Sequence, residues 1–199
     1  FLKVRELLRS GAIGRVTSVQ IEVLDVLPAA GQPIGWRVDP ATSGGGLFFD
    51  VGSHSLDMVD FLIGPITTIA GVAENTGRAY AAEDVTAASF LCGDRIPGTG
   101  LWNFNAARKE DTLTIRGASG TISTSMFTDA DIALSCGGRV DTFPIRNPPY
   151  VHQPLIQSIV DELLERGHCP STAESGARTS WALEQCVAGY YRSLREQVS

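Results

Sequence analysis

The chain has 199 residues, 43% of them hydrophobic, which suits one compact domain with a substantial core. Its 16 basic and 22 acidic residues give a net charge of −6, and the scattered basic residues argue against a nucleic-acid-binding surface. No apolar run approaches the roughly 20 residues of a membrane span. No signal peptide or glycosylation sequon is recognisable either. We therefore expect a cytoplasmic protein with no nucleic-acid or membrane partner.

The four cysteines are far apart in the sequence and include no CxxC pair; they are Cys92, Cys136, Cys169 and Cys186. Zinc sites and redox motifs usually place cysteines close together, and disulfide-stapled scaffolds are smaller and richer in cysteine. We therefore expect free thiols in a reducing compartment.

The N-terminal part of the chain reads as a helix followed by a strand. The chain starts at Phe1, without methionine, already inside an amphipathic helical segment, residues 1–14, that contains a glycine stop. Natural chains rarely begin this abruptly, so we expect the back part of a longer polypeptide. Residues 14–27 alternate like a strand with one buried face. Residues 28–46 are rich in proline and glycine and are predicted to form a long loop, a kind of segment that is often functional.

The next pattern is a helix over 51–62, which ends before Gly64-Pro65 and which Asp50 or Ser53 is predicted to cap. Short β-branched or alternating segments then follow, punctuated by turns: 66–76, 84–93, 98–107, 111–127, 131–138 and 139–145. Successive hairpins without intervening helices indicate an antiparallel sheet rather than a doubly wound parallel one.

Two helices are predicted to close the chain, over 151–167 and 171–197, the second opening with Ser171 and Glu174 as a capping box. The fold class is therefore α+β: residues 1–199 form one domain with a large, open, mainly antiparallel sheet and helices on one face. Strand segments such as 87–92 carry apolar residues at odd and even positions, and therefore on both faces of the sheet. We therefore expect the second sheet face to pack against another copy in a homo-oligomer.

The segment 43–64, SGGGLFFDVGSHSLDMVDFLIG, combines three consecutive glycines with a carboxylate and an imidazole. Asp50 and His54 are four residues apart, so on a helix they share one face. A neighbouring carboxylate stabilises an imidazolium and orients the ring for general acid–base chemistry, and the glycines allow a ligand close to the backbone. Structural roles stay open for both residues: Asp50 as an N-cap, and His54 as a partly buried histidine bonded to backbone.

Other chemistries have weaker support in this segment. Asp50, His54 and Asp57 can face one side of a helix, but one histidine without cysteine is a weak zinc signal, and we expect no metal site. Ser53 lies outside any G-x-S-x-G nucleophile elbow. No glycine run has the G-x-G-x-x-G spacing of a dinucleotide-binding turn, so a redox cofactor would be held elsewhere.

Residues 36–64, WRVDPATSGGGLFFDVGSHSLDMVDFLIG, resemble the signature segment of the Gfo/Idh/MocA oxidoreductases. The run G-G-G-x-x-x-D-x-G-x-H-x-x-D is specific for that family. The resemblance covers essentially the whole chain, through the further segments 3–23, 83–104, 113–123 and 152–193.

The resemblance implies an enzyme of two domains. An N-terminal Rossmann domain binds NAD or NADP, and a C-terminal α/β domain uses its sheet for subunit contacts. Substrates in this family are mostly sugars, cyclic polyols and related hydroxy or keto compounds. This chain corresponds to the C-terminal domain and lacks both the Rossmann domain and the lysine of its E-K-P motif.

The resemblance also implies roles for single residues. His54 matches the proton-transfer histidine of the family, and Asp50 matches its acidic partner near the substrate hydroxyls. Trp36 and Arg37 lie in the loop that borders nicotinamide and substrate, so both are candidates for substrate and cofactor contact. His152 lies near the active-site rim in some members, but a lone histidine before a helix favours a structural role.

The leading hypothesis is the substrate-binding and oligomerisation domain of an NAD(P)-dependent dehydrogenase, with His54 as general acid/base and Asp50 as its partner. We expect a homodimer or homotetramer formed through the open sheet face. The chain by itself should be inactive, because it has no place to hold the dinucleotide. The alternative is a non-catalytic sugar-binding or dimerisation module with the same fold. The presence of both Asp50 and His54 counts against that alternative.

Overall fold

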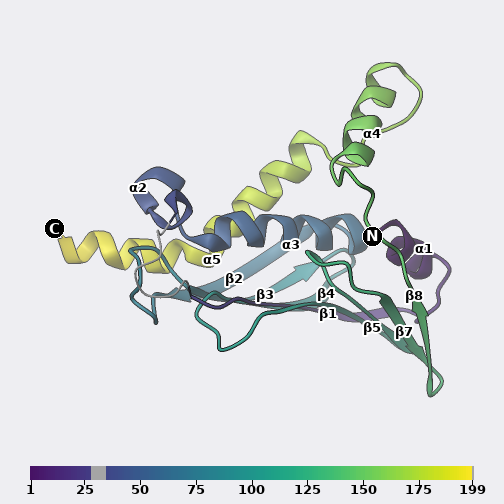
Figure 1. Cartoon of the computed structure of the whole chain (residues 1–199), viewed down its shortest axis with the longest axis horizontal. Helices are drawn as coiled ribbons and strands as arrows, with labels where there is room; N and C mark the ends of the chain where they lie inside the picture. Colours follow the sequence, from purple (N-terminus) through teal and green to yellow (C-terminus); the bar gives the residue numbers. More distant parts are fainter. Residues whose placement is uncertain (28–34, 199) are drawn as a thin grey trace.

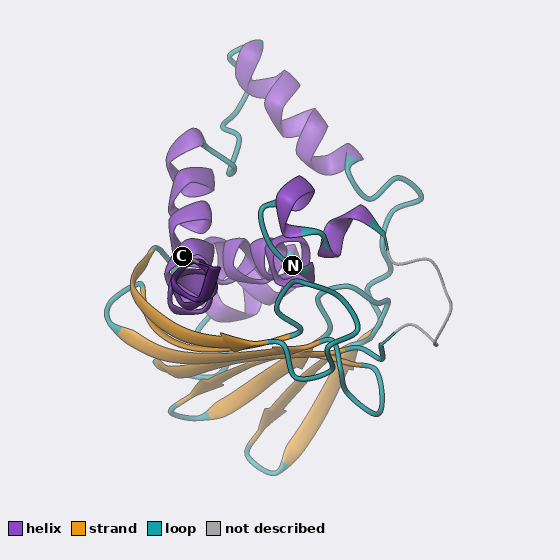
Figure 2. Ribbon diagram, turned by 90° about the vertical axis from the view of Figure 1, so that its left-hand side faces the viewer, coloured by secondary structure: helices purple, strands orange, loops and turns teal. Residues whose placement is uncertain are grey.

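The computed structural model describes residues 1–27 and 35–198, which form one sheet covered on one face by helices (Figure 1, Figure 2). The strands of the described residues are β1 (Val16–Leu24), β2 (Ile66–Glu74), β3 (Val85–Cys92), β4 (Ile96–Asn103), β5 (Glu110–Gly117), β6 (Gly120–Thr124), β7 (Ile132–Cys136) and β8 (Arg139–Phe143). The helices are α1 (Leu2–Arg9), the 3-10 helix η1 (Trp36–Val38), α2 (Pro40–Ser43), α3 (Leu47–Ile63), α4 (Gln153–Leu163) and α5 (Ala173–Val198).

The strands lie in the order β2-β3-β4-β1-β5-β6-β7-β8. β1 runs parallel to β4, and every other neighbouring pair in this sheet is antiparallel. The parallel pair arises because the segment with α2 and α3 carries the chain away from β1 before the meander β2-β3-β4 returns to it. The predicted α+β fold class, with an open, mainly antiparallel sheet and helices on one face, is confirmed.

The core lies between the sheet and the inward face of α3. The ring of Phe48 on this face meets Trp102 of β4 edge-on, with ring centroids 4.8 Å apart. The Nε1–H of the fully buried Trp102 donates to Oγ of Ser55 at 3.2 Å, so the indole finds a partner inside the core. These contacts fix which face of α3 meets the sheet and therefore which face meets solvent.

α3 extends the predicted helix 51–62 by one turn at its start and has 17 residues. Its N-cap is Gly46, with no side-chain cap bond, so the predicted capping by Asp50 or Ser53 is wrong. The backbone N–H of Gly46 instead donates to both carboxylate oxygens of Glu83, at 2.9 and 3.0 Å. A carboxylate distant in sequence thus satisfies the helix start in place of a local cap.

Two further local predictions differ from the structure. Within the predicted loop 28–46, residues 28–34 lie outside the described residues, and the remainder contains η1 and α2. α2 is capped by Asp39, which accepts the N–H of Ala41 at 3.2 Å, and it ends at Gly44 with a φ of 82°. This left-handed conformation favours glycine and explains the first glycine of the three.

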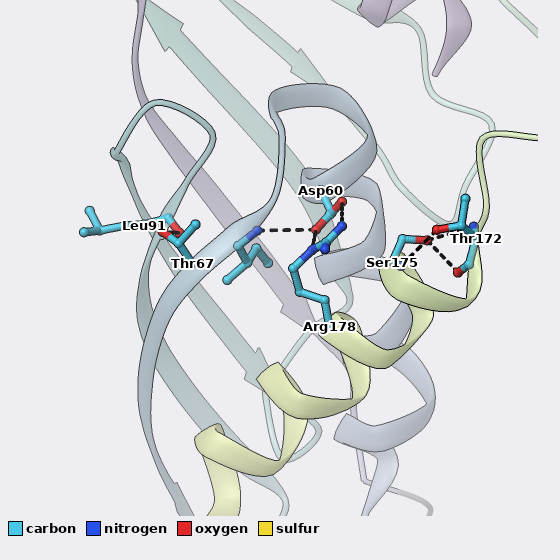
Figure 3. Close-up of polar contacts among 7 residues, drawn as sticks. Asp60, Thr67, Leu91, Thr172, Ser175 and Arg178 are labelled. Carbon is cyan, nitrogen blue, oxygen red and sulfur yellow. Dashed lines mark hydrogen bonds and ion pairs between the residues drawn. The ribbon is translucent and has the colours of Figure 1, made fainter.

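The start of α5 is capped one residue later than predicted. The N–H of Ser175 donates to Oγ1 of Thr172 at 3.2 Å, and the N–H of Thr172 donates to Oγ of Ser175 at 3.0 Å (Figure 3). The capping box predicted for Ser171 and Glu174 is therefore wrong in register. The reciprocal geometry survives because Thr172 and Ser175 keep the same three-residue spacing.

The second face of the sheet carries no described helix (Figure 2). One row of paired positions crosses this face, and its side chains are small or uncharged: Ala70, Ser89, Thr99, Gln20, Thr114, Ser123 and Ala133. On the opposite face of the same strands, Phe90 and Trp102 are buried under the helices. The two faces therefore differ at these positions, and none of the described helices covers the outward row.

α4 stands away from the sheet (Figure 1), and none of its residues is buried. Within the described part of the chain, no helix combines the length and apolarity that a membrane crossing requires. The four cysteines are unpaired thiols, with Cys136 exposed and the other three buried.

Candidate active site

α3 carries the two predicted site residues on its solvent side. Because the buried stripe of the helix faces the sheet, positions 50, 54 and 57 lie on the outer side at spacings of four and three residues. Asp50 and His54 are exposed, and Asp57 is half-buried. The carboxylate of Asp50 and the imidazole of His54 are thus one turn apart on one helix face, as the sequence predicts.

Asp50 forms an ion pair with Arg37 of η1, with Nε and Oδ2 2.9 Å apart. The guanidinium of Arg37 also lies 4.8 Å from the ring centroid of Trp36. About half of each charged side chain is exposed, so the pair adds little to stability. The ion pair nevertheless joins three predicted site residues, Trp36, Arg37 and Asp50, in one continuous group. The sequence analysis did not identify Arg37 as the cationic partner of Asp50.

His54 has an aromatic neighbour that the sequence analysis missed. Its ring meets the ring of Phe127 edge-on, with centroids 6.3 Å apart and an interplanar angle of 77°. Asp57 follows one turn later on the helix. Burial and the charge of Asp60 raise the pKa of Asp57, whereas the charge of His54 lowers it. The imidazole therefore has acidic residues one turn before and one turn after it along α3.

The second and third glycines before α3 have protein neighbours. A Cβ on Gly45 would lie 2.2 Å from the ring of Phe49, and a Cβ on Gly46 would lie 2.4 Å from the carbonyl oxygen of Glu83. No side chain fits at either position without a shift. The structure thus explains these glycines by close packing within the chain, where the sequence analysis expected the approach of a ligand.

The fully buried carboxyl group of Glu83 links α3 and α5 to the loop before β3. It accepts the N–H of Gly46 at the start of α3 and the hydroxyl of Tyr191 on α5. Burial raises the pKa of Glu83, and the bonds from Tyr191 and Gly46 oppose that rise. This network holds the N-terminal end of α3, and with it the turn that carries Asp50.

The sequence analysis also considered Ser53 as a nucleophile, His152 as a rim residue and a metal site. The Ser53 hydroxyl donates to the carbonyl of Asp50 at 2.6 Å, which occupies it within its own helix. His152 is exposed at the N-cap position of α4. Among residues 1–27 and 35–198, no three His, Cys, Asp or Glu side chains are grouped so as to hold a metal ion.

Sequence reasoning missed Phe127 and Glu83. Each is a single residue beside a strand, without a motif or periodicity that distinguishes it from other residues of its kind. Contact with the first turns of α3 is what makes them part of the site, and that contact depends on the strand order of the sheet.

Comparison with known proteins decides the family. The model of the GFO/IDH/MocA C-terminal domain matches residues 1–123, more than half of the chain. The chain belongs to the Gfo/Idh/MocA family. This Gfo/Idh/MocA chain is also similar to Oxidoreductase P35 of Formosa agariphila, with 31% identity over 188 residues, covering 92% of the chain and 57% of that protein. It therefore spans little more than half the length of that relative.

Solved structures share the fold. An aldose–aldose oxidoreductase from Caulobacter crescentus, complexed with glycerol, superposes with a TM-score of 0.77 at 19% identity over 98% of this chain and 58% of its own. A levoglucosan dehydrogenase in complex with NADH gives a TM-score of 0.78 at 16% identity over 95% of this chain and 60% of its own. At these identities, the likeness establishes the fold.

Proposed function

We propose that this chain is the substrate-binding and oligomerisation domain of an NAD(P)-dependent oxidoreductase that acts on a sugar, a cyclic polyol or a related hydroxy or keto compound. The observation that carries the proposal is the pair of Asp50 and His54 on the solvent side of α3, in a chain of the Gfo/Idh/MocA family. The similar proteins, an oxidoreductase and an NADH-bound dehydrogenase, support the same reaction class.

Trp36 and Arg37 offer an indole and a cation to the edge of a nicotinamide cofactor, whereas the turn before α3 does not offer a site for its pyrophosphate. A pyrophosphate needs free backbone N–H groups at a glycine turn that opens a helix. Before α3, the N–H of Gly46 is already bonded to Glu83. We therefore assign the dinucleotide mainly to a domain outside this chain, with Trp36 and Arg37 at its nicotinamide edge. When bound, the cofactor would accept or supply the hydride.

The residues of this chain would supply the proton chemistry. Oxidation of a secondary alcohol removes the hydroxyl proton while the hydride leaves the carbon. His54 takes that proton on a ring nitrogen and returns it in the reverse direction. Asp50, one turn earlier, accepts a hydrogen bond from a substrate hydroxyl, while the ion pair with Arg37 holds its carboxylate in place.

The test replaces His54 by alanine in the polypeptide that contains this chain. Assayed with NAD⁺ and NADP⁺ on a panel of sugars and polyols, His54→Ala should lower turnover about 10²–10⁴-fold, the range of general acid–base catalysis. Its unfolding midpoint should not change, because His54 is exposed. The matched control is His168→Ala, an exposed histidine between α4 and α5. Near-wild-type turnover of His54→Ala contradicts the role, and a wild type without NAD(P)-linked turnover favours the non-catalytic sugar-binding module.

We also propose that the chain forms a homodimer or homotetramer through the uncovered sheet face. No position of this row carries a charged side chain, and its Gln20 accepts a hydrogen bond from the neighbouring Arg116 at 3.0 Å, so a second copy can pack against the row while that guanidinium stays hydrogen-bonded. Thr99→Lys places a charge in the middle of the row and should reduce the mass found by light scattering to that of a monomer. Ser180→Lys, on the exposed side of α5, is the control and should leave the mass unchanged.

A further inference from the structure

The turn after β6 brings an exposed aromatic ring to the proposed general base. The ring of Phe127 meets that of His54 edge-on with centroids 6.3 Å apart, and 42% of Phe127 remains exposed. The exposed part of the Phe127 side chain, next to the exposed imidazole, is accessible to a ligand. The proposed function gives Phe127 no role.

One carboxylate fixes the backbone of this turn. Asp111, near the start of β5, accepts the N–H groups of three successive residues, Met126 at 3.0 Å, Phe127 at 2.7 Å and Thr128 at 3.2 Å. The hydroxyl of Ser125 also donates to Asp111 and accepts the N–H of Thr128 at 2.8 Å. Hydrogen bonds from N–H groups to a carboxylate are stronger than neutral ones. Phe127 is therefore presented by a well-anchored turn.

The anchor of the turn is continuous with the core. Asp111 pairs in register with Val23 of β1, in the middle of the sheet. Ser125 is buried, and Met126 packs against the hydrophobic core. α3 is tied to the same sheet through Trp102. Since both elements are fixed to one sheet, the approach of the two rings is set by the fold.

We propose that Phe127 contacts the substrate and determines its specificity, as an apolar wall beside His54 against which the C–H face of a ring-shaped sugar or polyol packs. The inference rests on the proposed function and deepens it. An aromatic face is electron-rich, and the hydrogens on hydroxyl-bearing carbons are slightly positive, so the two surfaces attract. Binding sites commonly combine such a wall with a few polar groups that fix orientation. Here those groups are Arg37, Asp50 and His54.

The kinetic test compares Phe127→Leu and Phe127→Tyr in the full polypeptide, with 1,5-anhydroglucitol as the ring probe and D-glucitol as its open-chain counterpart. Phe127→Leu should lower kcat/KM for the ring probe about tenfold, the upper range of an aromatic contact, mainly through KM. Phe127→Tyr keeps the aromatic face and should stay close to wild type. The open-chain probe, which has no rigid C–H face, should respond much less.

Several outcomes overturn the proposal. They are equal losses for ring and open-chain probes, a tyrosine variant as impaired as the leucine variant, and a wild type that turns over neither probe. Failure of the proposed function is recognised separately, because His54→Ala would then keep wild-type turnover on the sugar and polyol panel. If His54→Ala is inactive while Phe127→Leu behaves like wild type, the specificity role of Phe127 is contradicted and the proposed function is not.

A substrate-free measurement checks the geometry. The ring current of Phe127 should displace the imidazole proton resonances of His54, and Phe127→Leu should remove that displacement in the NMR spectrum. Asp111→Ala, which frees the turn, should change the same resonances. Phe143→Leu is the control, because that ring lies on β8 against Lys3. Identical His54 resonances in wild type and Phe127→Leu would overturn the proposal.

Discussion

Asp60 of α3 and Arg178 of α5 form a doubly bonded ion pair, with Nε–Oδ2 at 2.6 Å and Nη2–Oδ1 at 3.1 Å (Figure 3). The same carboxylate accepts the N–H of Ile66 at 3.3 Å. The side chain of Asp60 is only 10% exposed and that of Arg178 29%. One acidic group thus joins the end of α3 to β2 and α5. It helps to set the orientation of the helix that carries Asp50 and His54.

Arg178→Met should lower the free energy of unfolding by about 2–3 kcal/mol, because it leaves a largely buried carboxylate without its cation. The partial exposure of Arg178 keeps the loss below that of a fully buried pair. Urea unfolding measures it. Arg108→Met is the matched control, since Arg108 pairs with Glu110 at 2.6 Å but is 77% exposed, and it should change stability by less than about 0.5 kcal/mol. Equal effects of the two variants would contradict the structural role.

Gly46→Ala and Gly189→Ala should change stability in opposite directions. A Cβ on Gly46 meets the carbonyl oxygen of Glu83, so alanine there should destabilise by about 1–3 kcal/mol, as overpacking does. Gly189 lies inside α5 with open space around it, so alanine there should stabilise by about 0.5–1 kcal/mol. Thermal unfolding of both variants gives the comparison. A neutral Gly46→Ala would show that the turn before α3 is free to move.

Glu83→Gln should make stability less dependent on pH. Burial raises the pKa of Glu83 above its ordinary value of 4.5, so the native state keeps a proton that the unfolded chain has lost. That contribution to stability is complete below pH 4.5 and is lost as pH rises through the raised native pKa.

Glutamine does not ionise, and its amide oxygen can still accept hydrogen bonds from Gly46 and Tyr191. The stability of Glu83→Gln relative to wild type should therefore increase with pH above 4.5. Urea unfolding over a pH series measures this difference. Parallel pH curves for the two proteins would show that the carboxyl group of Glu83 does not titrate differently in the native state.

Arg37→Met should separate stability from function. The pair of Arg37 and Asp50 is half exposed, so its loss should change the free energy of unfolding by less than about 1 kcal/mol. If Arg37 holds the carboxylate of Asp50 for the substrate, kcat/KM should fall about tenfold. Arg139→Met breaks an ion pair with Asp141 on the edge strand β8 and should change neither quantity. Unchanged activity of Arg37→Met would show that Arg37 has no role in substrate binding or turnover.

Local patterns in the sequence determined most of the architecture. Alternation predicts the strands, helical spacing predicts α1, α3, α4 and α5, and hairpin turns predict the antiparallel sheet. The spacing of Asp50 and His54 also predicts their shared helix face, because the geometry of an α-helix alone places residues four apart on one side. The resemblance to the Gfo/Idh/MocA family depends on the same segment, and the family match confirms it.

Tertiary structure alone decided how that segment is held and what surrounds it. The start of α3 depends on Glu83, the partner of Asp50 is Arg37, and the ring beside His54 belongs to Phe127. Each of these contacts joins residues that are distant in sequence. Local periodicity in the sequence cannot predict such a contact. They exist because the sheet order β2-β3-β4-β1-β5-β6 brings separate turns to one helix, and that order follows from the packing of the whole core.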